Sequence, residues 1–228
     1  MGVSIQGNGG TVADVDGTLY RAIRTTGRPV DTGSLGFYQL SMTSGTIAAA
    51  LAASAQVFSM RWSDATRLMV LYNLNLKFQG LTPRTAATLT DFGFDAFIAR
   101  SFSVSASGGT AATLTGNSFK MRTSMGTTLL ADARIASTGA LTAGTQTLDG
   151  NAFIGSLGGP QRTNPAAATE EVVHQSPELV WVPNIENGES PIILAANEGI
   201  VIRNRTVWPV AGTGIVTVTA RWAEVSAY

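Results

Sequence analysis

The 228-residue chain has 13% charged residues, about half the usual share of a soluble domain, and its 15 basic and 15 acidic residues balance. This balance argues against a nucleic-acid-binding protein, which needs a basic surplus on one face. The absence of cysteine excludes a disulfide framework and a thiolate metal site. No apolar run reaches the roughly 18 residues that would predict a membrane-spanning helix.

The low charge favours an assembly protein. A monomer needs surface charge for solubility, so a surface this poor in charge suggests that partners cover much of it. Arginine outnumbers lysine by 13 to 2, and arginine is enriched at protein interfaces whereas lysine is depleted. The first ten residues carry neither the positive nor the apolar region of a secretory signal, so we expect a chain that is made in the cytoplasm and left unprocessed.

Residues 1–36 are rich in glycine, threonine and aspartate and contain few apolar anchors. We expect them to form an extended N-terminal arm of the kind that becomes ordered against a neighbour. Residues 37–228 are expected to form a single domain that opens with a core strand at 37–42. Residues 46–55 are rich in alanine, and they fit a short helix, a strand or a loop between sheets.

The clearest pattern in the chain is an eleven-residue alternation at 68–78, which predicts a long strand with one buried face. Met69 and Leu71, on the other parity, are also apolar. The first half of this strand is therefore expected to be buried on both faces, the second cover being a sheet, the arm or a neighbouring subunit. The apolar residues of the first parity are Leu68, Val70, Tyr72, Leu74, Leu76 and Phe78.

Alternation predicts further strands along the chain. At 57–62 the large apolar residues share one parity and are expected to point inward, and residues 63–66 form the turn that follows. A second long strand is expected at 92–104, where one parity is apolar apart from Arg100. Shorter strands are expected at 133–137, 146–157, 178–183, 192–195, 199–203 and 216–222, with glycine-rich loops at 105–116 and 158–169.

Many strands, glycine-rich turns and no convincing amphipathic helix indicate an all-β fold. We expect an antiparallel β-sandwich, of which the jelly roll is one form, with the N-terminal arm extending from it. No internal repeat of fixed period is present.

One motif near the N-terminus suggests chemistry. Asp14-Val15-Asp16-Gly17-Thr18 resembles the DxDGT signature of haloacid-dehalogenase-like phosphatases, in which the first aspartate is the nucleophile and the second the acid/base beside Mg²⁺. That signature follows a buried strand, whereas glycine-rich sequence precedes it here. It also needs a later lysine on an α/β scaffold, and the only lysines are Lys77, inside the long strand, and Lys120. A polar turn is the preferred interpretation.

The other candidate residues also favour structural roles. His174, the only histidine, follows two glutamates and is expected to be exposed to solvent, because no nucleophile-elbow motif supports a catalytic triad. Asp91 and Asp95 would lie about 13 Å apart on one strand face, too far to share a metal ion, and are expected to be solvated. We therefore predict no enzyme, with no catalytic, cofactor-binding or metal residues and no cofactor.

The four tryptophans allow two interpretations. They could form a carbohydrate-binding platform, or they could belong to the core. Trp62 and Trp222 lie on the apolar parity of their strands, so core packing is expected for these two. The other two are Trp181 and Trp208.

Several short motifs carry a family resemblance. They are SGT at 44–46, LAA at 51–53, VFSMRWSDAT at 57–66, GGTAATLTGN at 108–117, RTSMG at 122–126, AANEG at 195–199 and WAEV at 222–225. Together these motifs resemble segments of small uncharacterised structural proteins of tailed bacteriophages. The resemblance spans most of residues 30–228, contains no catalytic residues, and implies a β-rich, oligomeric virion component.

These observations lead us to expect a structural component of a bacteriophage virion. A capsid decoration or cement protein is favoured, which would bind the major capsid protein and itself as a symmetric oligomer, with a trimer favoured. No nucleic-acid or membrane partner is expected. The alternatives are another part of the virion (major capsid, tail tube or fibre-attachment protein) and a carbohydrate- or receptor-binding β-module.

Overall fold

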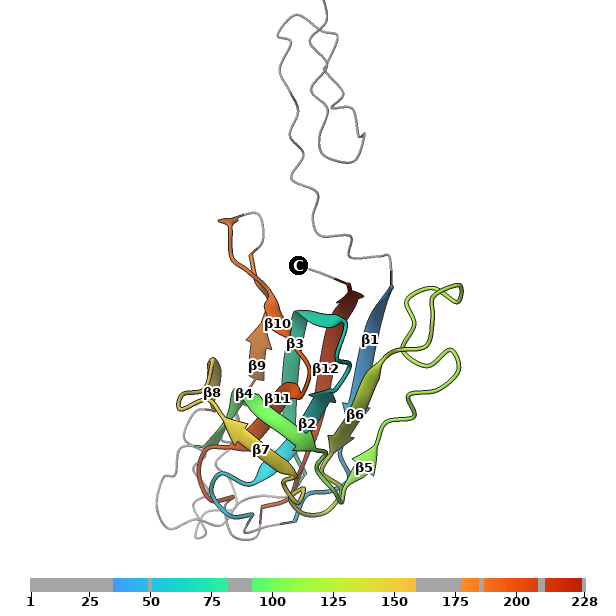
Figure 1. Ribbon diagram of the computed structural model, residues 1–228. Coiled ribbons are helices and arrows are strands. Elements are labelled where there is room, and N and C mark those ends of the chain that lie inside the picture. The colour runs from blue at the N-terminus through green and yellow to red at the C-terminus, as the bar shows by residue number, and fades with distance from the viewer. Residues whose placement is uncertain are drawn as a thin grey trace, which may run out of the picture. The chain divides into compact units, whose positions relative to one another are not determined.

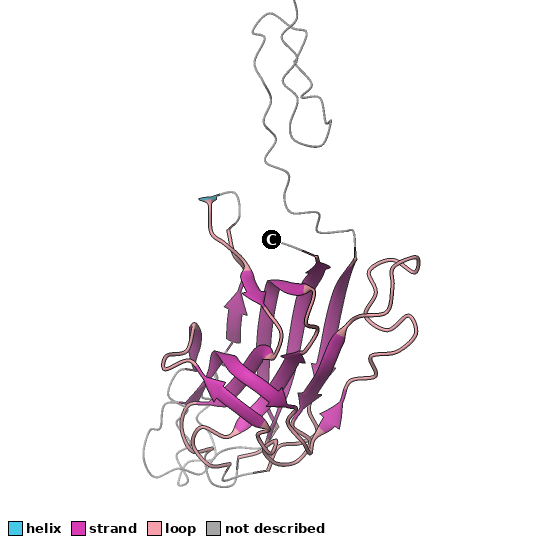
Figure 2. Ribbon diagram, in the orientation of Figure 1, coloured by secondary structure: helices cyan, strands magenta, loops and turns pink. Residues whose placement is uncertain are grey.

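The computed structural model describes residues 35–48, 51–81, 92–158, 178–184, 187–208 and 212–226. In these residues the chain forms two antiparallel β-sheets that pack against each other (Figure 1), and Figure 2 shows that strands dominate the described part. The predicted all-β sandwich is confirmed. The predicted arm lies outside the described residues except at its last two positions, so the division at residue 36 stays a prediction.

Five strands form the small sheet. Its centre is β12 (Gly214–Val225), which lies between β1 (Gly36–Thr43) and β3 (Leu68–Gly80). The far edge of β3 is shared by β9 (Glu178–Trp181) and β10 (Ile192–Leu194).

Seven strands form the large sheet. The order begins with β5 (Thr110–Ala111), β6 (Leu130–Ile135) and β2 (Gln56–Trp62), and continues with β11 (Glu198–Asn204) and β4 (Phe92–Val104). The outer edge of β4 pairs with β8 (Ile154–Gly158) near its start and with β7 (Thr145–Leu148) near its end.

The connections give the sandwich a defined topology. To compare this topology with known folds, we number positions along the chain, leave out β5 and β6, and count β7 with β8 as position 5 and β9 with β10 as position 6. The small sheet then has the order 1-8-3-6 and the large sheet the order 2-7-4-5. This is the strand order of a jelly roll, in which two Greek keys interlock. The short strands β5 and β6 are an insertion between the fourth and fifth positions, and β6 pairs with the outer edge of β2.

One apolar cluster fills the space between the sheets. At one end of it, Phe78 of β3 meets Phe92 and Phe94 of β4, with Trp208 packed beside them. The ring centroids of Phe92 and Trp208 lie 4.7 Å apart at a steep angle, the edge-to-face geometry that aromatic rings prefer. Because β3 and β4 belong to different sheets, these rings join the two layers.

Strand β3 confirms the long strand predicted at 68–78 but contains a β-bulge. In its pairing with β12, Asn73 lies opposite Arg221 whereas Leu71 lies opposite Trp222, so Tyr72 is an extra residue in β3. An extra residue shifts the alternation by one position, which reverses the parity that faces the core.

The two halves of β3 therefore bury opposite parities. After the bulge, residues of the predicted parity, from Leu74 to Phe78, face the core cluster. Before the bulge, Met69 and Leu71 face the core instead, so the prediction of a single inward parity is wrong for this half of the strand. The first half is buried on both faces, as predicted, because Val70 is also fully buried. On the outer face Val70 lies between Ala223 of β12 and Ile193 of β10.

Strand β4 also departs from a single parity. Ser101 has a φ of 50°, a left-handed conformation that turns the strand before its end. Phe102 consequently packs with Ala99 and Val201 in a second small cluster on the outer face, and Val104 is 55% exposed. The prediction of one apolar face from Phe92 to Val104 is wrong beyond Arg100.

The other predicted elements agree with the structure apart from their ends. The region 146–157 contains two strands instead of one, and the loop 105–116 contains β5. The described part of 46–55 has no helix, and Ile47 there forms a β-bridge with Gly214. Beyond Gly158, the loop predicted at 158–169 lies outside the described residues.

Candidate interaction surfaces

Most residues that suggested chemistry are not among those described. Asp14, Asp16, Asp91 and His174 all lie outside the described residues. Within the described ranges no group of three or more histidine, aspartate or glutamate side chains could hold a metal ion. The same part of the chain contains no helix that is long and apolar enough to cross a membrane.

Asp95 is described, and its environment corrects the prediction of a solvated carboxylate. Its side chain is only 18% exposed and pairs with Arg205, whose Nε lies 3.1 Å from each carboxylate oxygen and whose Nη2 also donates to Oδ1. Arg205 is the residue that follows β11, and β11 pairs with β4. The pair therefore ties the end of β11 to its neighbour, and it has a structural role.

The tryptophans belong to the core. Trp62, Trp208 and Trp222 have no exposed surface, as expected for Trp62 and Trp222. Trp181 is half-buried and packs edge-to-face on Phe153, with ring centroids 6.0 Å apart. Three of the four therefore present no ring surface to a sugar, and the fourth, Trp181, is partly covered.

The outer face of the large sheet carries charges that pair with one another. Arg100 forms ion pairs with Asp149, at 3.2 Å, and with Glu198. Arg134 pairs with Asp132 at 3.0 Å. These side chains already have partners within the chain, so this face offers few free charges to a ligand.

The chain also covers part of this face. After the turn at Ser101, Phe102 is fully buried and its carbonyl oxygen accepts a hydrogen bond from Arg61 Nε. Arg61 Nη2 donates to Asn197 Oδ1 at 3.1 Å. The end of β4 and the loop before β11 are thus fastened over the sheet.

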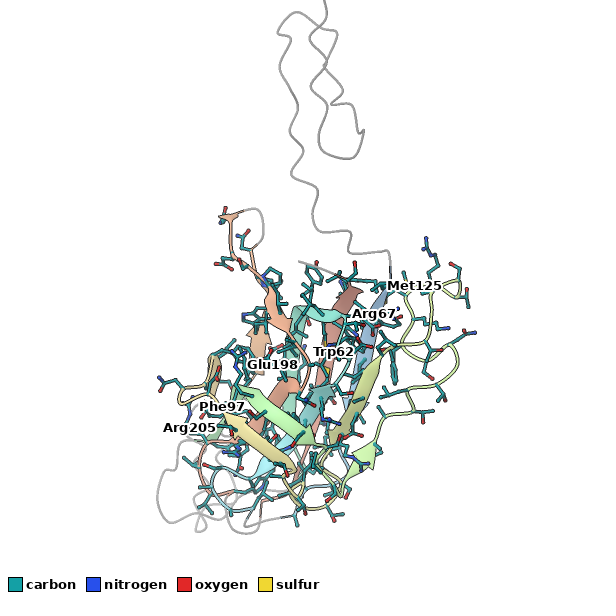
Figure 3. All side chains as sticks on the ribbon, viewed as in Figure 1. Trp62, Arg67, Phe97, Met125, Glu198 and Arg205 are labelled. Carbon is teal, nitrogen blue, oxygen red and sulfur yellow. The ribbon has the colours of Figure 1, made fainter. Side chains whose placement is uncertain are left out.

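A segment before β6 closes one edge of the small sheet. We call residues 117–129 the strap. Gln39 N donates to Phe119 O at 2.9 Å, and Met121 N donates to Phe37 O at 3.1 Å. Met125, labelled near the start of β1 in Figure 3, accepts from Phe37 N at 3.2 Å. The strap therefore pairs with the first half of β1, which would otherwise be an open edge strand.

A buried carboxylate anchors the strap. Glu224 is 1% exposed and lies on β12. It accepts hydrogen bonds from Thr128 Oγ1, from Leu129 N at 3.0 Å and from Trp222 Nε1 at 3.3 Å. Burial raises the pKa of the Glu224 carboxyl, while these donors and the charge of Arg67 lower it in part. The sequence alone did not single out this residue, although Glu224 shares the inward parity of Trp222.

Tyr38 completes this end of the core. Its ring stacks on Trp222 with centroids 5.6 Å apart, and its hydroxyl donates to Gly126 O at 3.0 Å. Burial, together with the negative charge of Glu224, raises the pKa of Tyr38 to about 12. The hydroxyl therefore stays protonated at neutral pH and keeps its donor role toward the strap.

We expect Glu224→Ala to lower the free energy of unfolding by about 3 kcal/mol, because it leaves several buried donors without an acceptor. Glu224→Gln retains an acceptor and should cost much less. In the wild type the raised folded-state pKa means that this group stabilises the fold most at acid pH and less as the pH rises through that pKa. Urea unfolding from about pH 4 to 7 should therefore show wild type losing stability relative to Glu224→Gln. An unchanged difference across this range would contradict the account.

The outer face of the small sheet carries mainly uncharged polar side chains along the middle of its strands, with Lys77, Glu178 and Arg221 as the charged ones. Its outward side chains come from 39–43 of β1, 217–221 of β12, 73–77 of β3 and 178–180 of β9, and we call it the threonine face. Most of these side chains are hydroxyls and amides, and many are exposed.

None of the known protein families, curated proteins or solved structures compared with this chain matches it. The function must therefore be inferred from the residues and surfaces of the chain itself.

Proposed function

We propose that the chain is a structural component of a bacteriophage virion, a capsid decoration or cement protein that binds the head shell as a symmetric oligomer. The observation that carries this proposal is the threonine face, a sheet surface on which hydroxyl and amide side chains outnumber the charged ones. Such a surface can be buried against protein at a low desolvation cost, because few charges lose their hydration. Repeated over many symmetric copies, a modest contact area stabilises a whole shell.

The fold and the sequence supply further support. Jelly rolls recur in viral capsid proteins and in lectins, so the strand order fits the proposal without deciding it. The motifs that resemble tailed-phage structural proteins favour the virion over the lectin. The low charge and the excess of arginine over lysine point to an assembled protein as well.

The carbohydrate-binding alternative has weaker support. A glycan-binding module presents aromatic rings at its surface, where sugars can stack on them. In the described ranges every aromatic side chain is buried or half-buried. Phe37 packs on Tyr72, for example, with ring centroids 5.8 Å apart. These rings serve packing, which favours a structural role.

Mass spectrometry of particles purified from the phage that encodes this chain tests the proposal. We expect the chain in purified virions, at a fixed ratio to the major capsid protein. A low copy number, typical of a tail part, would move the assignment to another virion role. Absence from the virion would overturn the proposal.

A further inference from the structure

We propose that the strap is a lid over the edge of β1, and that it opens while both sheets stay folded. Thr128 of the strap and Glu224 of β12 form the latch that holds the lid closed. Opening uncovers the edge of β1, which can then pair with another strand. The inference concerns a motion within one copy of the chain, and it does not depend on the proposed function.

The first argument is the place of the strap in the chain. β5 pairs with β6 in an antiparallel hairpin, in which Thr110 lies opposite Ile135. Residues 112–129 are the loop of this hairpin, and Figure 1 shows them beside β1, which belongs to the other sheet. Because β5 and β6 hold the two ends of the loop together, the strap can leave β1 while the strand pairs of both sheets stay intact. Loops longer than about 15 residues are uncommon in compact domains, and many of them are functional lids.

The second argument is that the middle of the strap is lightly attached. Two backbone hydrogen bonds join it to β1, one at Gln39 and one at Phe37. Phe37 N donates to the thioether of Met125, which is a weak acceptor. Among residues 121–127, Met125 alone is partly buried and the others are exposed. Opening therefore uncovers little apolar surface, which is what a local opening of low free energy requires.

The third argument is the backbone conformation of the closed strap. Phe119 has a φ of 65°, in the left-handed region that an aromatic residue rarely adopts. Its carbonyl oxygen accepts from Gln39 N at 2.9 Å, so the strained residue is one that binds β1. The turn bond beside it, from Lys120 N to Asn117 O, is long at 3.4 Å. Opening relieves this strain, and the contacts with the small sheet, more than the strap's own structure, keep it closed.

The latch lies where the strap runs into β6. Glu224 accepts from Thr128 Oγ1 and from Leu129 N, which lies 3.0 Å from Oε1 and 3.2 Å from Oε2. Thr128 Oγ1 in turn accepts from Leu130 N at 3.1 Å, and Thr128 is 7% exposed. Hydrogen bonds to a buried carboxylate are stronger than those between neutral groups. The strongest attachment of the strap is therefore this one point, and loss of the Thr128 hydroxyl should loosen it.

β1 keeps its place when the strap opens. It pairs with β12 along its whole length, and Tyr38 and Leu40 are fully buried in the core. Opening frees the outward backbone groups of Phe37 and Gln39. The backbone groups of Ser41 point the same way, since alternate residues of an edge strand face outward. The open form therefore presents a continuous edge that an extended segment can extend as a further strand.

Amide hydrogen exchange of the full chain, measured by NMR at about pH 7, tests the lid. The strap reporters are the amides of Gln39 and Met121, which join the strap to β1, and the core reporters are the amides of β12 that donate to β3. In wild type we expect the strap reporters to exchange at least a hundredfold faster than the core reporters. Their rates should also be nearly independent of urea below about 1 M, because a local opening exposes little surface.

Three variants separate opening of the strap from unfolding of the domain. Thr128→Val keeps the shape of the side chain but removes its hydroxyl, and it should speed exchange of the strap reporters at least fivefold. Thr127→Val, at the exposed neighbouring residue, is the matched control and should exchange as wild type. Phe78→Leu weakens the core at the end of β3 away from Met69, which lies opposite Glu224. It should speed exchange of the core reporters several-fold and leave the strap reporters unchanged, because the open and closed forms lose the same core contact.

Equal exchange rates for the strap and core reporters in wild type would overturn the inference, because the strap would then open only when the domain unfolds. So would a Phe78→Leu variant that speeds both sets of reporters alike. If Thr128→Val leaves the strap reporters unchanged, or Thr127→Val speeds them as much, the latch is wrong. None of these results bears on whether the chain is present in virions, so the lid and the proposed function can fail separately.

Discussion

Leu71→Asp is expected to prevent the chain from folding at neutral pH. Leu71 has no exposed surface and lies on the core side of β3, between Trp222 of β12 and Ile192 of β10. An aspartate there would bury a carboxylate without a partner, at a cost on the order of 5 kcal/mol or more. Because domains are stable by only about 5–15 kcal/mol, this change removes most or all of the stability.

The matched control is Asn73→Asp, two residues along the same strand. Asn73 lies beyond the bulge and is half-buried on the outer face, where a carboxylate keeps contact with water. We expect this variant to fold, with a loss below about 1 kcal/mol. Near-ultraviolet circular dichroism and the yield of soluble protein separate the two outcomes. A folded Leu71→Asp variant would show that the assignment of Leu71 to the core is wrong.

Phe78→Ala should lower the free energy of unfolding by about 3–5 kcal/mol. The side chain is 4% exposed, and its ring centroid lies 5.1 Å from that of Phe92 in the other sheet and 5.2 Å from that of Trp208, which follows β11. The loss combines the transfer of a phenyl ring to water, the cavity that remains and the edge-to-face contacts. Denaturant unfolding monitored by tryptophan fluorescence measures it.

Two controls keep this prediction specific. Phe78→Leu retains most of the buried volume and should cost less than Phe78→Ala. Val104→Ala removes an aliphatic side chain that is 55% exposed, and it should change stability by less than about 0.5 kcal/mol. Equal losses for Phe78→Ala and Val104→Ala would contradict the placement of Phe78 in the core that joins the sheets.

The sequence predicted the positions of the strands better than it predicted the bulges and turns within them. The alternation at 68–78 located β3, but it could not reveal the bulge, because apolar residues occupy both parities around Tyr72. The same limit applies to β4, where the left-handed Ser101 turns the strand although serine carries no signal for that conformation. Period-2 patterns report local direction, whereas bulges and turns depend on the neighbouring strands.

The surfaces needed long-range pairing that a single sequence does not display. The outward parity of Thr217 and Thr219 was visible in the sequence. Their neighbours were not, because Ser41 lies 178 residues from Thr219 along the chain. The strap was missed for the same reason. The inward position of Glu224 could have been predicted, because it lies two residues after Trp222 on the same strand. An acidic residue is, however, rarely expected in a core.

A reconstruction of the whole particle by electron cryomicroscopy tests the central claim most directly. We expect a two-layered β-sandwich of this size on the outside of the head shell, in symmetric copies that bridge capsid subunits. A shell without such density, or this sandwich resolved only in the tail or absent from the particle, would contradict the account.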